Sequence, residues 1–221
     1  MANPFKAVMN IRRHELPLAL LMFGYFFLVI SSFWILKPLK KSLFISYYQT
    51  SGLDILSLHL TASQSELIAK VMNMVVAFIA VTVFTYLTRN FRRQQLTYIF
   101  SSFFMICFVG YGFILDDPAD ITVWSFYLFG DLFSTLMVAT FFVFMNDSVT
   151  SDKAKRLYGL VGLGGVTGGV FGSLFVKMWI KQFSIDTWLW ITFAIGALII
   201  LIAMSAGKIV TKNPPQEKVI A

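Results

Sequence analysis

The stretch LTYIFSSFFMICFVGYGFIL, residues 96–115, carries no charged side chain. A helix of about 20 apolar residues is long enough to cross the hydrocarbon core of a bilayer, whereas in water the same run would expose a large apolar surface. Five other stretches have this character, so the sequence predicts six membrane-spanning helices. Their approximate limits are residues 16–36, 67–87, 96–115, 123–145, 157–177 and 188–206.

The composition agrees with a chain that lies mostly in lipid. Of the 221 residues, 57% are hydrophobic and 13% are charged, and the mean hydropathy is +0.75. A soluble domain is roughly 45–50% apolar and about 25% charged, and disordered chains are poor in apolar residues. The composition therefore excludes a soluble enzyme and a disordered chain.

The residue types that carry enzyme or metal chemistry are few and scattered. Cys107 is the only cysteine, which excludes an internal disulfide and a cysteine-based metal site. His14 and His59 are isolated, and the sequence contains neither a Ser–His–Asp set nor paired catalytic carboxylates. We therefore expect no enzyme activity, no metal site and no cofactor.

The charged residues between the spans indicate the orientation of the chain. With the amino terminus inside, 12 of the 18 basic residues fall in the cytoplasm, as the positive-inside rule requires. The other side receives an acidic cluster of Asp116, Asp117 and Asp120. We therefore expect both termini in the cytoplasm, and topology accounts for most of the net charge of +7. The basic residues are spread over four short loops, so we expect no nucleic-acid partner.

The chain divides into three predicted regions. Residues 1–15 are basic and weakly amphipathic, and are expected to lie along the cytoplasmic membrane surface. Residues 16–206 form the six-helix transmembrane domain, and residues 207–221 form a polar cytoplasmic tail. The first span is too long for a cleaved signal peptide, so it is expected to remain as an anchor. A capping box of Ser63 and Glu66 is predicted to begin the second span.

Asp131 is the least expected residue of the spans, because it lies eight residues into the run 123–145. An acid near a helix centre costs about 2.5–3.5 kcal/mol on insertion scales, so it should face a polar cavity or a basic partner. The alternative is that the helix begins later and that Asp131 lies near the outer interface.

Three cations, Lys37, Lys40 and Lys41, follow the first span, whose helix is expected to continue past Pro38 with a kink. On such a helix Lys37 and Lys41 share a face, with Lys40 offset by roughly 100°. The three can attract phosphate or pair with Asp131. The alternative is that they extend along apolar surface to place their charges at the interface.

Two further patterns indicate packing inside the membrane. Lys70 can pair with Glu66, which precedes it by one helical turn. The fifth span carries two stripes of small residues, which let helices approach closely. The stripes are Gly164, Gly168 and Gly172, and Gly165, Gly169 and Ser173.

The spans divide into two sets of three, and the first helix of each set bears the unusual charge. Each six-helix half of a major facilitator transporter contains inverted three-helix repeats, with the substrate site at matching positions. The predicted fold class is an all-α integral membrane protein with six transmembrane helices as two three-helix repeats, half of a major facilitator fold.

Two stretches resemble the nucleotide transporter family, the ATP/ADP antiporters of plastids and intracellular bacteria and their relatives. YFFLVISSFWILKPLKKSLFI, residues 25–45, is similar to the first helix of that family. Residues 130–174 resemble its fourth helix, the next loop and the fifth helix, with Asn146, the Thr-x-x-x-Ala-Lys-Arg spacing at 150–156 and Tyr158. The resemblance extends over nearly the whole chain, but only over the amino-terminal half of the usual twelve-helix unit.

The resemblance implies a substrate-binding set. In the family, a basic residue late in the first helix and an acid in the fourth are needed for nucleotide exchange. Lys40, and with it Lys37, would supply the basic position, and Asp131 would stand where the family more often has glutamate. Asn146 completes the candidate set.

The leading hypothesis is a transporter of nucleotides such as ATP and ADP, or of other phosphorylated anions, working by alternating access. It would pair with a second six-helix half, either another copy or another subunit. One alternative is a transport-inactive structural or assembly subunit of a larger membrane complex, and another is a part of a longer protein. The expected surroundings are membrane lipids of a bacterial inner membrane, with an organelle membrane as the second choice.

Overall fold

The computed structural model describes residues 12–55 and 58–212, and six long helices account for most of this part of the chain. All six are long and apolar enough to cross a membrane, which confirms the prediction of an all-α membrane protein with six spans. The helices are α2 (Leu16–Ser51), α3 (Ala62–Asn90), α4 (Arg93–Ile114), α5 (Asp120–Ser148), α6 (Ser151–Trp179) and α7 (Ile185–Lys212).

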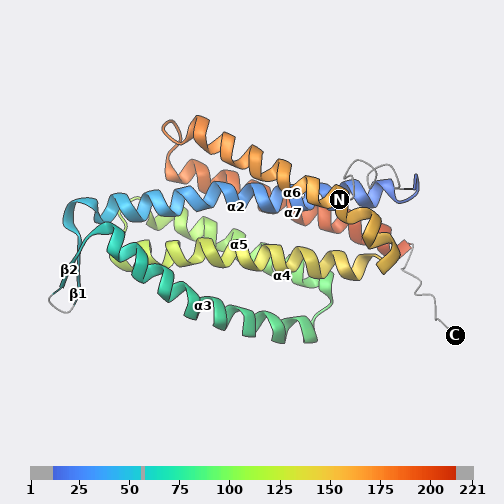
Figure 1. The fold of residues 1–221 in the computed structure, drawn as a ribbon, viewed down its shortest axis with the longest axis horizontal. Coiled ribbons are helices and arrows are strands. Elements are labelled where there is room, and N and C mark those ends of the chain that lie inside the picture. Colours follow the sequence, from blue (N-terminus) through green and yellow to red (C-terminus); the bar gives the residue numbers. More distant parts are fainter. Residues whose placement is uncertain (1–11, 56–57, 213–221) are drawn as a thin grey trace, which may run out of the picture.

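The helices run alternately up and down the long axis of the molecule (Figure 1). The start of α2 and the end of α7 lie at one end, which we call the terminal end. The opposite end carries two short strands and is called the hairpin end. The predicted surface segment lies mostly outside the described residues, as does the last part of the predicted tail. The first part of that tail continues α7 as far as Lys212.

A small hairpin connects α2 to α3. β1 (Leu53–Ile55) pairs antiparallel with β2 (Leu58–Leu60), with Leu53 opposite Leu60. Gly52 ends α2 with a φ of 64°, in the left-handed region that favours glycine. Strands of three residues are too short for a recognisable alternation of apolar and polar residues, which explains why the sequence did not reveal them.

The predicted capping box of Ser63 and Glu66 is wrong. The N-cap of α3 is Thr61, whose backbone N–H donates a hydrogen bond to Oε1 of Gln64 at 2.9 Å. The capping-box spacing occurs twice in TASQSE, and the helix begins at the earlier copy. Glu66 therefore lies inside the helix, where its carboxylate is available to lysines.

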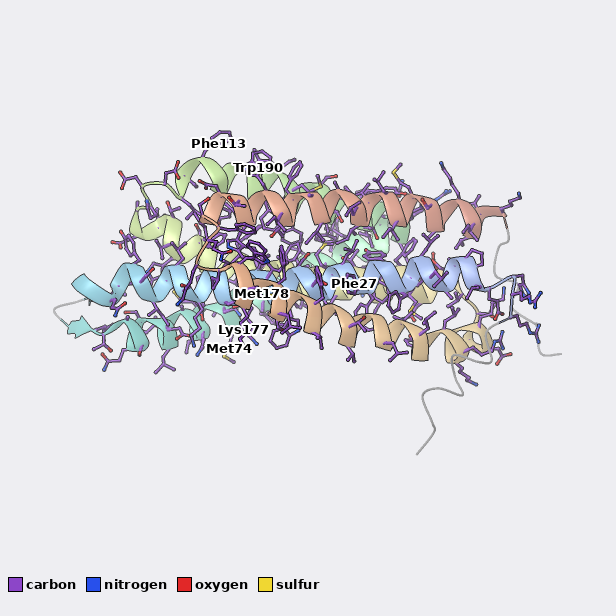
Figure 2. All side chains as sticks on the ribbon, turned by 90° about the horizontal axis from the view of Figure 1, so that it is seen from above. Phe27, Met74, Phe113, Lys177, Met178 and Trp190 are labelled. Atoms are coloured by element: carbon purple, nitrogen blue, oxygen red, sulfur yellow. The ribbon has the colours of Figure 1, made fainter. Side chains whose placement is uncertain are left out.

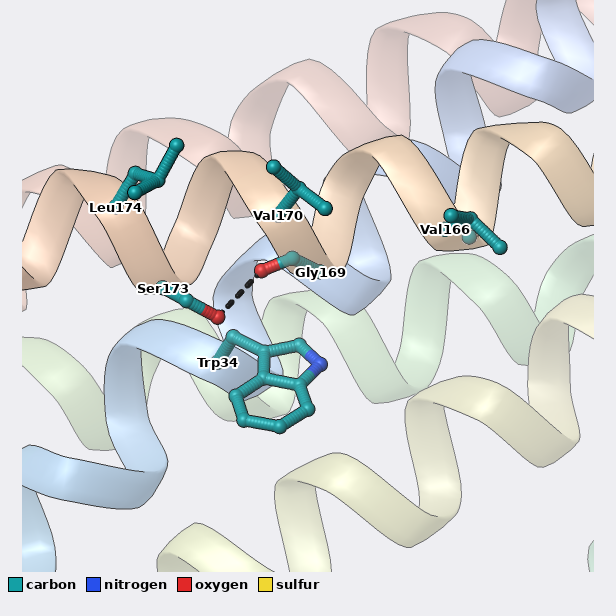
Figure 3. Close-up of a pocket in the computed structure, with 7 residues that line it drawn as sticks. Trp34, Val166, Gly169, Val170, Ser173 and Leu174 are labelled. Atoms are coloured by element: carbon teal, nitrogen blue, oxygen red, sulfur yellow. Dashed lines mark hydrogen bonds between the residues drawn. The ribbon is translucent and has the colours of Figure 1, made fainter.

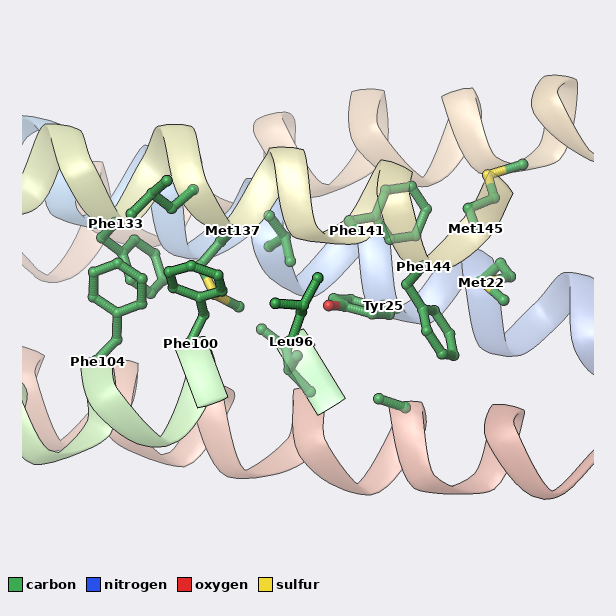
Figure 4. Close-up of a cluster of buried hydrophobic side chains, with 14 of the residues drawn as sticks. Met22, Tyr25, Leu96, Phe100, Phe104, Phe133, Met137, Phe141, Phe144 and Met145 are labelled. Carbon is green, nitrogen blue, oxygen red and sulfur yellow. The ribbon is translucent and has the colours of Figure 1, made fainter. Parts of the chain in front are cut away.

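Aromatic side chains fill the interior between α2, α4 and α5. Four phenylalanines, Phe104, Phe108, Phe129 and Phe133, meet edge to face with ring centroids 5.0–5.5 Å apart. Figure 4 shows the neighbouring part of this cluster, in which Tyr25 of α2 lies beside Phe141 of α5. The bundle therefore has a packed interior on this side of α2.

The outer surface of the bundle is strongly apolar. Met74, Phe113, Met178 and Trp190, which Figure 2 labels, all have exposed side chains. α3 is the least buried helix and α5 the most buried. A surface of this kind suits contact with lipid or with another membrane protein.

The close approach of α6 to α2 confirms the packing role of the first glycine stripe. A Cβ atom on Gly164, Gly168 or Gly172 would lie 2.5–2.7 Å from a backbone carbonyl oxygen of α2. Ser31 of α2 donates a hydrogen bond to the carbonyl oxygen of Gly168 at 3.1 Å. The two backbones touch because the stripe carries no side chains.

We expect Gly168→Ala to destabilise the bundle by about 1–3 kcal/mol, because its methyl group would force α6 away from α2. Thermal unfolding in detergent measures the effect. Gly162→Ala is the matched control, because the space around Gly162 is open to 4 Å. Equal melting temperatures for the two variants would contradict the close packing.

An ion pair at the terminal end connects the start of α2 to α6. Arg156 donates to Glu15 from Nη2 at 2.6 Å and from Nε at 3.3 Å, and the backbone N–H of Arg12 donates at 3.3 Å. Burial raises the pKa of the Glu15 carboxyl, but the hydrogen bonds from Arg156 and Arg12 outweigh it and lower the pKa below its ordinary 4.5.

We expect Glu15→Gln to destabilise the protein near pH 7 by about 1–3 kcal/mol, through loss of this charge-assisted pair. A lowered pKa in the folded protein means that the stabilisation is present above pH 4.5 and is lost as the pH falls through the folded value. The melting temperatures of the unmodified protein and Glu15→Gln should therefore converge as the pH falls below the lowered pKa of Glu15 in the folded protein. A difference that persists unchanged at acid pH would contradict this role of the carboxylate.

Candidate functional site

Lys40 and Asp131 meet because their helices run in opposite directions. Lys40 lies eleven residues before the end of α2, and Asp131 lies eleven residues after the start of α5. At 1.5 Å per residue, both are about 16 Å from their helix ends at the hairpin end. The structure thus places an acid and a base at the same depth inside the spans.

The two side chains form an ion pair. Lys40 Nζ contacts Asp131 Oδ1, and Lys40 is only 5% exposed. The same ammonium group lies 4.3 Å from the centroid of the Tyr127 ring and 3.4 Å from the Tyr127 carbonyl oxygen. Asp131 is less enclosed, with 29% of its side chain exposed. The prediction that Asp131 faces a basic partner is confirmed.

Gly130 makes room for the lysine. A Cβ atom at this position would lie 2.7 Å from Cδ of Lys40. The lysine stem can therefore cross α5 closely enough to reach Asp131 and Tyr127. The five residues YLFGD, 127–131, thus supply the ring of Tyr127, the space at Gly130 for the lysine stem and the carboxylate of Asp131.

A second charged cluster lies beside the first, around Glu66 of α3. Its carboxylate oxygen Oε1 is 3.1 Å from Lys70 Nζ and 3.3 Å from Lys41 Nζ, so the predicted pair with Lys70 is confirmed. The hydroxyl of Tyr127 donates to the same carboxylate at 3.4 Å. Tyr127 thereby connects the two clusters.

Sequence reasoning missed Tyr127 and the contact between Lys41 and Glu66. The spacing from Tyr127 to Asp131 is one helical turn, which places both on one face of α5. That spacing could have indicated from the sequence that Tyr127 lies beside Asp131. The contact of Lys41 with Glu66 joins two different helices, so no local pattern could have indicated it.

Lys37 lies on another side of α2. Its ammonium group is 5.2 Å from the ring centroid of Trp34 and 5.3 Å from that of Phe33. It lines a groove between α2 and α6 together with Lys177 of α6. The structure therefore does not bring Lys37 to the pair of Lys40 and Asp131.

Asn146 lies near the terminal end of α5, fifteen residues and about 22 Å from Asp131 along the helix. Its side-chain oxygen accepts a hydrogen bond from the Tyr158 hydroxyl at 2.7 Å, across the connection from α5 to α6. Arg93 and Asp147 form an exposed ion pair nearby, at 3.2 Å. Asn146 thus belongs to the opposite end of the molecule from the charged clusters.

The fold and these charges define a six-helix membrane protein with an enclosed ion pair between two of its helices. The family model described as TLC ATP/ADP transporter matches residues 2–123. The chain therefore belongs to the TLC ATP/ADP transporter family. The match includes Lys40 and Glu66 but ends before Asp131 and Asn146.

A curated relative is the ADP,ATP carrier protein 1 of Rickettsia conorii. It is 22% identical over 191 residues, and the comparison covers 72% of this chain and 35% of the relative. The chain thus spans about a third of the length of that relative. No solved structure matches the chain.

We expect Asp131→Asn to destabilise the protein more than Lys40→Met. Removing one partner of a buried pair costs up to about 3–5 kcal/mol, because the remaining charge lacks compensation. The cation left by Asp131→Asn is 5% exposed as a residue, whereas the carboxylate left by Lys40→Met is 29% exposed. Thermal unfolding of the folded protein in mild detergent measures the difference.

The double variant Lys40→Met with Asp131→Asn should be more stable than Asp131→Asn alone. Additive effects of the two substitutions would contradict an energetic coupling between the side chains.

Proposed function

We propose that this chain is one half of a membrane transporter for nucleotides, such as ATP and ADP, or related phosphorylated anions. The observation that carries the proposal is the ion pair of Lys40 and Asp131 between α2 and α5. Membership of a transporter family supports the same conclusion. Charged residues inside membrane spans are costly and commonly serve a substrate or ion path.

Competition for Lys40 explains how the pair would act. A phosphate group carries the same sign of charge as the Asp131 carboxylate and can replace it as the partner of Lys40. The lysine would then hold the substrate, while Asp131 would neutralise Lys40 whenever the site is empty. Because the pair joins α2 to α5, exchange of the partner would change how strongly these helices are held together.

The second charged cluster would extend the binding region. Lys41 and Lys70 share the single carboxylate of Glu66, so this cluster has one positive charge in excess. A phosphorylated anion bound beside Tyr127 would be attracted by this excess charge. Tyr127 itself would position Glu66 and Lys40 relative to one another.

The substrate path would lie between this bundle and a second six-helix half. Aromatic side chains fill the bundle interior, and Asp131 and the weakly buried α3 remain accessible from outside. The second half would be another copy or another subunit, and the two halves would alternate between access from each side. The proposed setting is a bacterial inner membrane with both termini in the cytoplasm.

A structural role is the second candidate, favoured by the enclosure of Lys40. Its charge is already neutralised by Asp131 and covered by Tyr127, as in an ion pair that only holds helices together. In that case the chain would be a transport-inactive subunit of a larger membrane complex. Its native size in mild detergent would then reflect unrelated partner proteins instead of a pair of halves.

Uptake of labelled ATP or ADP into liposomes containing the full chain and its native partner tests transport. We expect Lys40→Gln and Asp131→Asn each to reduce uptake at least about tenfold, the loss associated with about 1.4 kcal/mol of binding. Lys208→Gln, an exposed lysine near the terminal end of α7, is the control and should retain uptake.

Folding is checked for each variant by its elution volume and melting temperature. Unchanged uptake in both folded site variants would refute the proposed site. An absence of uptake of any phosphorylated anion by the unmodified protein, with its native partner present, would favour the structural role.

A further inference from the structure

A long groove follows the contact between α2 and α6. It consists of two adjoining cavities of about 480 and 490 Å³, which share Trp34 and Ser173 as lining residues. Figure 3 shows the first of these, with Trp34 of α2 beneath Gly169 and Ser173 of α6. The second cavity continues the groove toward the hairpin end, past Pro38 and Val176.

The second stripe of small residues forms part of the wall of this groove. Gly165 and Gly169 leave the surface of α6 open beside Phe26 and Trp34, so that the indole ring lies against the helix. The Ser173 hydroxyl donates to the carbonyl oxygen of Gly169 at 2.6 Å, which satisfies it within α6. The first stripe thus packs against the backbone of α2, whereas the second packs against aromatic side chains of α2 and lines the apolar groove.

Cations gather at one end of the groove. Lys37, Lys41 and Lys177 line the cavity nearer the hairpin end. Lys41 is held by Glu66 at 3.3 Å. Lys37 and Lys177 have no carboxylate within ion-pair distance among residues 12–55 and 58–212. Lys37 and Lys177 therefore place positive charge beside this largely apolar groove, and the described part of the chain does not neutralise it.

The position of Lys177 near the end of α6 suits a cation at the boundary between membrane and water. Lys177 lies two residues before the end of α6 at Trp179. From Lys177 the apolar part of the groove extends along α6 to Gly165, about 18 Å at the rise of a helix. The hydrocarbon of one bilayer leaflet is about 15 Å thick, half of the usual core. Charge and apolar length are thus arranged like the head and tail of a lipid.

We propose that this groove binds an anionic phospholipid. Lys37 and Lys177 would contact its phosphate, and one acyl chain would lie over Trp34 and along Gly169 and Val170 of α6. The apolar walls suit an acyl chain, whereas a nucleotide would need polar partners for its base and ribose. The groove lies between α2 and α6, apart from the pair of Lys40 and Asp131 between α2 and α5. Lys41 lines the groove and also contacts Glu66 of the proposed transport site, but the lipid proposal depends on Lys37 and Lys177, which the transport proposal does not use.

The test measures lipid binding to the full chain in mild detergent, by native mass spectrometry and by thermal shift. The probes are phosphatidylglycerol, phosphatidylcholine, inorganic phosphate and ADP. We expect phosphatidylglycerol to bind and to raise the melting temperature more than phosphatidylcholine does. Lys37→Gln combined with Lys177→Gln should weaken phosphatidylglycerol binding about tenfold or more, because two cations near the headgroup are lost.

Two matched controls separate charge, shape and folding. Lys208→Gln with Lys212→Gln removes two exposed lysines at the terminal end and should leave binding unchanged. Val170→Trp should fill the groove and reduce lipid binding without changing the charge. Leu198→Trp, at an exposed position of α7 that does not line the groove, should leave lipid binding unchanged. A melting temperature without added lipid confirms that each variant is folded.

Equal binding of phosphatidylglycerol and phosphatidylcholine would overturn the proposal, as would binding that neither the lysine pair nor Val170→Trp weakens. The proposal would also be overturned if ADP or inorganic phosphate stabilised the protein, the double lysine variant abolished this stabilisation and Val170→Trp left it intact. That result would assign the cations to a free phosphorylated anion. Loss of nucleotide uptake with lipid binding intact would affect only the proposed transport.

Discussion

Contact between the backbones of α2 and α6 sets the arrangement of one side of the molecule. Glycines 164, 168 and 172 rest against carbonyl oxygens of α2, leaving no space even for a methyl group. In lipid, helices gain little from the hydrophobic effect when they associate, so close packing and hydrogen bonds must hold them. The rigid contact fixes the rotation of α2, which directs Lys40 toward α5 and Lys37 toward the groove beside α6.

The surroundings of each lysine of α2 depend on that rotation. Three lysines within five residues of one helix have three different environments: an enclosed ion pair for Lys40, a shared carboxylate for Lys41 and two aromatic rings for Lys37. A charge without a partner is costly in a medium of low dielectric constant, so each environment compensates its cation differently. Lys40 is the only one of the three that is buried, and its charge is neutralised by direct contact with Asp131.

Much of the fold was predictable because the bilayer imposes simple requirements on the sequence. Length and hydropathy located all six helices, and the spacing of glycines in α6 indicated close packing. The start of α3 was misplaced because the segment TASQSE contains two overlapping capping patterns. For the site, the sequence indicated that Asp131 needs a basic partner. It did not indicate which of the three lysines this partner is, because the rotation of the first helix about its axis does not follow from the sequence. Asn146 was grouped with them by resemblance, although a long stretch of α5 separates it from Asp131.

The sequence alone determined the class of protein, since about 20 apolar residues in each of six runs leave few alternatives to membrane-spanning helices. It also determined which residues bear unusual charge. Only the tertiary structure decided which of those charges meet. Contacts between Lys40 and Asp131, or between Lys41 and Glu66, depend on the rotation and depth of whole helices. Those quantities result from packing across the bundle, because residues distant in the chain must fit together at the same time.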